Sequence, residues 1–140
     1  MVYYPQGNTR QTIVDVTFNT NDVNWNNQPA ALTEFLGLQN KRIAIDLSNF
    51  SQARLVVGLK SAGALIATLA IQYSVNLSTW NFLDGSSGPF VNLDTVGIKT
   101  SPNVIIASDA LKNVFLRLVG QNGDNFADPA FYIITLQLMW

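Results

Sequence analysis

The stretch KNVFLRLVGQNGDNFADPAFYIITLQLMW, residues 112–140, decides the fold. Two apolar runs flank a polar loop, and in the first run Leu116 and Leu118 alternate with Arg117. A period of two is typical of β-strands, because successive side chains point to opposite faces of a sheet. We therefore expect a strand whose leucines face the core. Arg117 then faces the other way, either as a solvated side chain or as half of an ion pair at an interface.

Similar runs occur from residue 41 onward. ALIATLAIQY alternates apolar side chains on one face and keeps small or polar ones on the other, which indicates a central strand buried on both sides. In chain order, the runs before residue 112 are KRIAIDL (41–47), ARLVVGL (53–59), ALIATLAIQY (64–73), WNFLD (80–84), FVNL (90–93) and NVIIA (103–107). Seven to nine strands with a single weak helical signal predict an all-β fold, an antiparallel β-sandwich of jelly-roll type over residues 41–140.

Composition changes near residue 40. Residues 19–28, NTNDVNWNNQ, contain five asparagines and almost no apolar periodicity, which predicts an extended linker. One short strand precedes it at residues 13–18, and PAALTEFLG (29–37) favours a short helical turn. We therefore expect residues 1–40 to form an N-terminal arm, laid over its own domain or exchanged onto a neighbouring subunit.

The amino-acid composition excludes several kinds of chemistry. The 140 residues contain no cysteine and no histidine. Thiol chemistry, the usual zinc sites and imidazole acid–base catalysis are therefore excluded, together with every Ser-His or Cys-His nucleophile pair. We expect a non-enzymatic binding or assembly module without a cofactor.

Charged residues are sparse and balanced. Eight Lys and Arg stand against nine Asp and Glu, and charged residues make up 12% of the chain. Nucleic-acid binding normally requires a clustered basic face, whereas here the basic residues are scattered, so no nucleic-acid partner is expected. No apolar stretch reaches the length of a membrane span, so no membrane partner is expected either. With so few charges to cover the outside, some apolar surface should lie against other chains, which favours a homo-oligomer.

The string IQYSVNLSTWNFLDG, residues 71–85, predicts a hairpin that brings Tyr73 and Trp80 near each other. The pair has two interpretations: an aromatic platform for a sugar ring, or a cross-strand pair that fills the core. Buried aromatic residues dominate sandwich cores, which favours the second interpretation.

The acidic residues raise two possibilities, a calcium site and the active site of a carboxylate hydrolase. Asn122, Asp124 and Asp128 crowd one loop with oxygen ligands of the type that calcium binds, but such residues are also ordinary turn formers, so no metal is expected. A carboxylate hydrolase would require two acids about 5 to 9.5 Å apart, one of them with a raised pKa in an apolar pocket. A small sandwich with short turns has little room for such a pocket. The loop aspartates are Asp84, Asp94, Asp109, Asp124 and Asp128.

QYSVNLSTW (72–80), IDL (45–47) and VFLRLVG (114–120) resemble the discoidin or coagulation-factor type C domains, which are jelly rolls that bind glycans or lipid head groups. The resemblance covers residues 41–140 loosely. The pair of cysteines that usually brackets those domains is missing here, and the turn has Asn76-Leu77-Ser78 instead of an Asp-Gly pair. The resemblance implies a secreted carbohydrate-binding module as one alternative, but no binding residue can be carried over from it.

LDGSSGPFVNL (83–93) and FLRLVGQNGDNFADPAF (115–131) are similar to small structural proteins of tailed bacteriophages, in particular the auxiliary, or decoration, capsid proteins of thermophilic phages. This resemblance implies a virion protein on the capsid surface, a trimer whose arms reach neighbouring subunits and which binds the major capsid protein. It also accounts for the Asn-rich arm, the low charge and the apolar C-terminus. The residues expected at such interfaces are Phe18, Trp25, Phe35, Leu36, Arg117 and Trp140.

Overall fold

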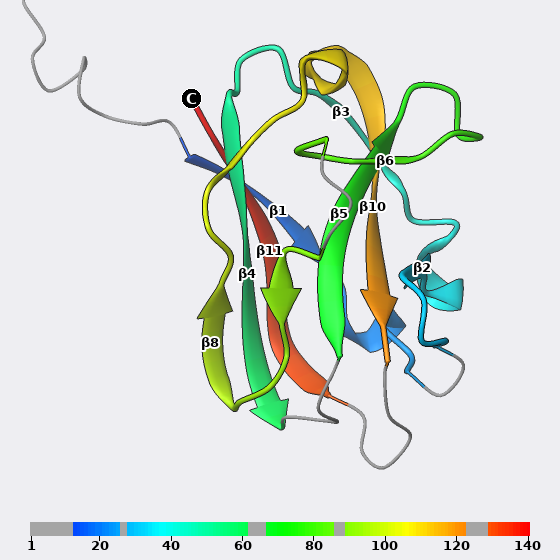
Figure 1. The fold of residues 1–140 in the computed structure, drawn as a ribbon, viewed down its shortest axis with the longest axis vertical. Helices are drawn as coiled ribbons and strands as arrows, with labels where there is room; N and C mark the ends of the chain where they lie inside the picture. The colour runs from blue at the N-terminus through cyan, green and yellow to red at the C-terminus, as the bar shows by residue number, and fades with distance from the viewer. Residues whose placement is uncertain (1–12, 26–27, 62–66, 86–88, 123–128) are drawn as a thin grey trace, which may run out of the picture.

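Two antiparallel β-sheets pack against each other in the computed structural model, which describes residues 13–25, 28–61, 67–85, 89–122 and 129–140 (Figure 1). The chain therefore folds as a β-sandwich, and the prediction of an all-β antiparallel fold is confirmed. Strands far apart in the sequence lie side by side, and the C-terminus lies beside the beginning of the first strand.

Sheet A contains, in spatial order, β1 (Ile13–Phe18), β11 (Ala130–Met139), β4 (Gln52–Ser61) and β8 (Gly97–Thr100), with β9 (Val104–Ile105) also beside β4. Sheet B has β10 (Asn113–Gln121) and β5 (Thr68–Ser74) at its centre. Beside β10 lie β2 (Thr33–Glu34) and β3 (Ile43–Asp46), and beside β5 lie β6 (Asn81–Phe82) and β7 (Val91–Asn92). Three 3₁₀ turns connect strands: η1 (Thr20–Asp22), η2 (Leu36–Leu38) and η3 (Ser108–Leu111).

The strand pairs are nested along the chain. The first strand pairs with the last, β2 and β3 pair with β10, β4 pairs with β8 and β9, and β5 pairs with β6 and β7. Contacts of β11 with β4 and of β10 with β5 join these pairs into the two sheets. Most pairings are therefore long-range, and the described strands depend on one shared core.

Alternating side chains of the two sheets build that core. Leu116 and Leu118 of β10 and Leu136 of β11 are fully buried, as the alternation predicted. All seven residues of β5 are buried, which confirms the expected central strand within the part of residues 64–73 that is described. Sheet B is thus covered on both sides along β5.

The described part of residues 1–40 belongs to the same sandwich. β1 pairs with β11 over its whole length, β2 pairs with β10, and Trp25 and Leu38 lie in the common core. The expected boundary at residue 40 is therefore corrected for residues 13–25 and 28–40, which are laid over their own domain. Residues 1–12 of the expected arm lie outside the described residues.

The helical turn predicted over residues 29–37 is present only at the end of that stretch, as η2, while Thr33–Glu34 is a strand. Only η2 is helical there, because β2 extends along β10 and Phe35 packs against Gly120. A Cβ atom at position 120 would collide with the ring of Phe35, so glycine provides the space for it. Gln28 lies in the stretch predicted to be a linker, yet its side-chain amide donates to the backbone carbonyls of Thr33 and Gly120. These hydrogen bonds therefore connect the segment around Gln28, which has no apolar periodicity of its own, to sheet B.

Candidate functional site

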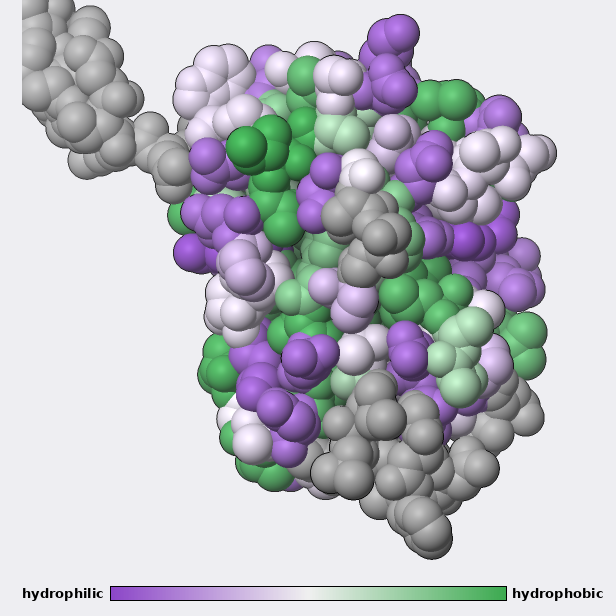
Figure 2. All heavy atoms as spheres, viewed as in Figure 1, coloured by the Kyte–Doolittle hydropathy of each residue, from purple (hydrophilic) through white to green (hydrophobic). Residues whose placement is uncertain are grey.

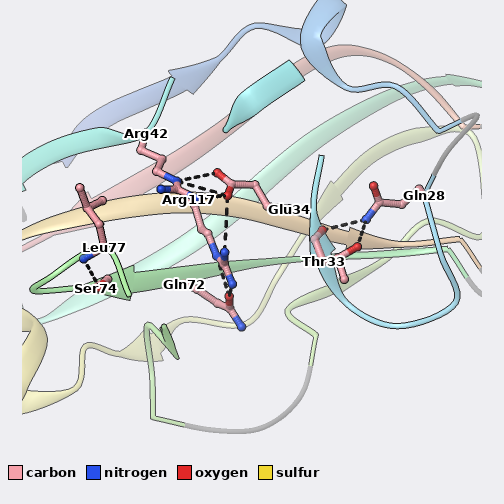
Figure 3. A network of polar contacts seen from close by, with 8 residues as sticks. All are labelled: Gln28, Thr33, Glu34, Arg42, Gln72, Ser74, Leu77 and Arg117. Carbon is pink, nitrogen blue, oxygen red and sulfur yellow. Dashed lines mark hydrogen bonds and ion pairs between the residues drawn. The ribbon is translucent and has the colours of Figure 1, made fainter. Parts of the chain in front are cut away.

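The outer face of sheet B, turned away from the core, carries a cluster of charged residues (Figure 3). The carboxylate of Glu34 lies between two guanidinium groups, with 2.8 Å to Nη2 of Arg42 and 3.4 Å to Nη1 of Arg117. Arg117 also donates two hydrogen bonds to Oε1 of Gln72, at 2.9 and 2.7 Å. The Glu34 side chain is only 3% exposed. These contacts tie β2, β3, β10 and β5 together.

Burial and pairing act in opposite directions on the two arginines. Desolvation lowers the pKa of Arg117, opposed by the charge of Glu34, whereas the hydrogen bond to Glu34 raises the pKa of Arg42. Both side chains remain charged at neutral pH, as arginine does in proteins. The cluster thus holds two cations around one buried anion, and Arg117 forms an ion pair within its own chain.

Trp80 also belongs to this cluster, and its contacts argue against a role as a sugar platform. The guanidinium carbons of Arg42 and Arg117 lie 4.9 and 4.3 Å from the centroid of its ring. Guanidinium groups at this range are attracted by the π-electrons of the ring. They therefore occupy ring surface on which a sugar would stack.

Tyr73 is buried, with 6% of its surface exposed, and burial followed by the charge of Asp109 raises the pKa of its phenol. The predicted hairpin is present, since Tyr73 pairs with Asn81 across β5 and β6. Tyr73, Trp80, Asn81 and Asp109 line one groove of about 420 Å³ at the end of the sandwich. The two aromatic residues are therefore neighbours, but Tyr73 does not offer its ring face to solvent.

The six residues expected at interfaces fall into a buried group and a more exposed group. Phe18, Trp25 and Phe35 are at most 5% exposed and belong to the core, so their placement on an interface is corrected. The ring of Trp25 packs edge-on against Phe35 at 4.9 Å between centroids. These residues are buried because the segment they come from forms part of both sheets. Leu36 and Trp140 are each 63% exposed.

The acidic candidates lie partly outside the residues that the structure describes. Asn122 is buried and its backbone N–H donates to the carbonyl of Pro29, while Asp124 and Asp128 of the calcium alternative lie outside the described residues. Within the described ranges no three acidic residues gather as a metal site. Asp94 accepts from Nζ of Lys99 at 2.6 Å, and this hydrogen bond is the main cause that lowers its pKa. A lowered pKa suits a structural anion rather than a general acid.

The outer face of sheet A is chemically different. Paired strands place their outward side chains in rows across the sheet. One row is polar: Asp15, Gln137 and Arg54. The rows around it are threonine-rich or apolar, and they contain Thr17, Thr135, Val56 and Thr100, then Ile133 and Ile98, and at the other end Ile13, Met139, Gln52 and Ile105.

Large apolar side chains of this face lie open to solvent. Ile13 is 48% exposed, Ile98 59%, Ile105 74% and Tyr132 50%. Tyr132 sits at a β-bulge in β11 with its ring over Gly58, where a Cβ atom would collide with it. On the side of the molecule that Figure 2 presents, green hydrophobic groups reach the surface between purple hydrophilic ones. The inward half of the alternation in β4 and β11 predicts the core, and the outward half is the local signal for this surface.

No described helix is long and apolar enough to cross a membrane. Comparisons of the chain with protein-family models, curated proteins and solved structures found no match.

Proposed function

We propose that this chain is a structural virion protein that oligomerises on the capsid exterior and stabilises the shell by bridging coat subunits. The observation that carries the proposal is the outer face of sheet A, a broad surface with few charges and several exposed apolar side chains. Exposed apolar patches of this kind mark surfaces that bind other proteins. The resemblance to phage auxiliary proteins implies the shell as the partner.

The proposed mechanism is burial of surface at several weak contacts. Each contact removes apolar area from water, at about 25 cal/mol per Å². An oligomer, the trimer in the resemblance, offers several copies of each contact at once. Tethered contacts act at a high effective concentration, so modest patches produce tight binding.

The jelly-roll type of the sandwich is part of the proposal. Nested pairing, first strand with last and inward from there, is the pattern obtained when one long antiparallel hairpin is wrapped into two sheets. If β2 and β3, β6 and β7, and β8 and β9 are each counted as one interrupted strand, the described residues form eight strands in this pattern.

The test is binding to shells. Capsids of the source virus, freed of auxiliary proteins, are mixed with the chain and sedimented. We expect saturable binding at a fixed ratio to the major capsid protein and a raised melting temperature of the shell. A chain that stays in the supernatant at every concentration would contradict the proposal.

A second candidate is a carbohydrate-binding module, with secretion as its setting. The groove lined by Tyr73, Trp80, Asn81 and Asp109 favours it, because it combines aromatic, amide and carboxylate groups, which suit a neutral sugar. Titration with simple glycans, followed by tryptophan fluorescence, distinguishes the two. Saturable quenching that is lost in Asn81→Ala, a variant that keeps the tryptophan reporters, would favour the module, and no change in fluorescence would count against it.

A further inference from the structure

We propose that the outer face of sheet A binds the same face of a second copy of this chain, around a two-fold axis that runs along β11. The inference rests on the proposed function, because it names one of the contacts through which the chain would assemble. Three properties of the face support it: its apolar side chains, its size and the position of its two central charges.

The apolar side chains of this face are separate from the core. Met139 is 1% exposed, yet it lies outside the main core cluster because it points away from sheet B. Its neighbour across the strand pair is Ile13, and Tyr132 lies on the same face over Gly58. Met139 is already covered in the single chain, and a covering copy would in addition bury Ile13 and Tyr132, which are 48% and 50% exposed.

The size of the face fits a protein interface. The four strands have six, ten, ten and four residues, and at about 4.8 Å between strands and about 3.3 Å per residue they cover roughly 480 Å². A stable protein–protein contact buries about 800 Å² on each partner, and protruding side chains add to the flat area. Face-packed sheets keep their strands within about 30° of each other, which two copies of one sheet can do.

The two central charges are arranged for exchange between copies. Arg54 donates from Nε to Oε1 of Gln137 at 2.6 Å, and Gln137 donates from Nε2 to Oδ1 of Asp15 at 3.3 Å. Within the described part of the chain neither Asp15 nor Arg54 forms an ion pair. They lie at one level on opposite sides of β11. A two-fold axis along β11 therefore sets each Asp15 opposite Arg54 of the second copy.

This symmetry restricts the number of copies. A face that meets itself makes a contact with two-fold symmetry, whereas a trimer needs two different surfaces in contact. The chain then forms dimers or, if it also forms trimers, hexamers in which the outer face of sheet A joins one trimer to the next.

The experiment compares the charges one at a time and together. The full chain is studied by sedimentation equilibrium with Asp15→Arg, with Arg54→Asp and with both substitutions. We expect even-numbered species for the natural chain, an association constant lowered about tenfold or more in each single variant, and recovery in the double variant. Asp15→Asn, which can still accept from Gln137, should weaken association less than Asp15→Arg does.

Thermal unfolding of each variant identifies those that lose their fold. The natural chain alone decides the outcome if the single variants do not fold. Only monomers or only trimers at about 100 µM would overturn the inference. So would a double variant that associates no better than the single ones. Shell binding by a chain that never forms even-numbered species would leave the proposed function standing, and even-numbered species that fail to bind shells would contradict only the proposed function.

Discussion

The two outer faces of this sandwich handle their polar groups in opposite ways. On sheet B, Glu34, Arg42, Arg117 and Gln72 satisfy one another within the chain, and the cluster includes the ring of Trp80. On sheet A, Asp15 and Arg54 each share a hydrogen bond with Gln137 and form no ion pair among the residues that the structure describes, and exposed isoleucines lie on the same face. The difference teaches that charge on a surface does not by itself mark a binding site. Charges that pair within the chain stabilise its own fold. Charges left without an ion pair beside exposed apolar groups favour the binding of a partner.

The largest effect is expected on stability, from a substitution that breaks the network around Glu34. Glu34→Gln removes the one anion between two guanidinium groups and leaves their charges unpaired and partly buried. We expect the free energy of unfolding to fall by about 2 to 4 kcal/mol, measured by urea denaturation. The control is Asp94→Asn, which removes an ion pair with Lys99 at the surface and should lower the free energy of unfolding much less than Glu34→Gln does. Equal losses in the two variants would contradict the structural role of Glu34.

A smaller effect is expected on association. Ile13→Arg places a charge on the outer face of sheet A, and it should weaken self-association about tenfold, or about 1.4 kcal/mol, in sedimentation experiments. Val75→Arg is the matched control, since Val75 is similarly exposed but lies in the hairpin turn of the other sheet. If only Val75→Arg weakens self-association, the contact does not lie on sheet A and the inference is contradicted.

The ring of Trp80 should contribute less than Glu34 does. Trp80→Leu removes its attraction to two guanidinium groups and should cost about 1 kcal/mol of stability in the same urea experiment. Trp140→Leu changes a ring that is 63% exposed and should cost less than about 0.5 kcal/mol. If the second change costs more, Trp80 does not belong to the network as described.

The smallest effect concerns alkaline pH. The folded chain raises the pKa of Tyr73 and so keeps the phenol proton to a higher pH than the unfolded chain does. Stability should therefore decrease as the pH rises through about 10, the ordinary value for tyrosine. Tyr73→Phe should make the urea midpoint less sensitive to pH between about 9 and 11, whereas Tyr132→Phe, at a half-exposed tyrosine, serves as the control. An unchanged pH dependence in Tyr73→Phe would contradict this assignment.

The sequence predicted the parts of the fold that follow a period of two. The alternation around Arg117 placed Leu116 and Leu118 in the core and Arg117 on the outer face, and the structure agrees. The segment before residue 40 could not be predicted in the same way. Its attachment depends on the hydrogen bonds of Gln28 to Gly120 and on the space that Gly120 leaves for Phe35. These contacts join residues far apart in the chain, and no local pattern reports them.

The candidate surfaces were predicted less completely than the fold. The partner of Arg117 is Glu34, 83 residues away, and only the pairing of β2 with β10 brings the two together. The outer face of sheet A has a local signal, the apolar residues at outward positions such as Ile133 and Met139. Which positions face outward is settled only when the register of the strands is known.

Hydroxyl-radical footprinting of the chain, at concentrations well above and well below the dissociation constant of its self-association, tests most directly that the outer face of sheet A is the assembly surface. We predict that modification of Ile13 and Tyr132 falls in the associated state, while Leu36 and Val75, which are as exposed but lie elsewhere, stay equally reactive. Protection of Leu36 or Val75 with no change at Ile13 and Tyr132 would contradict the account.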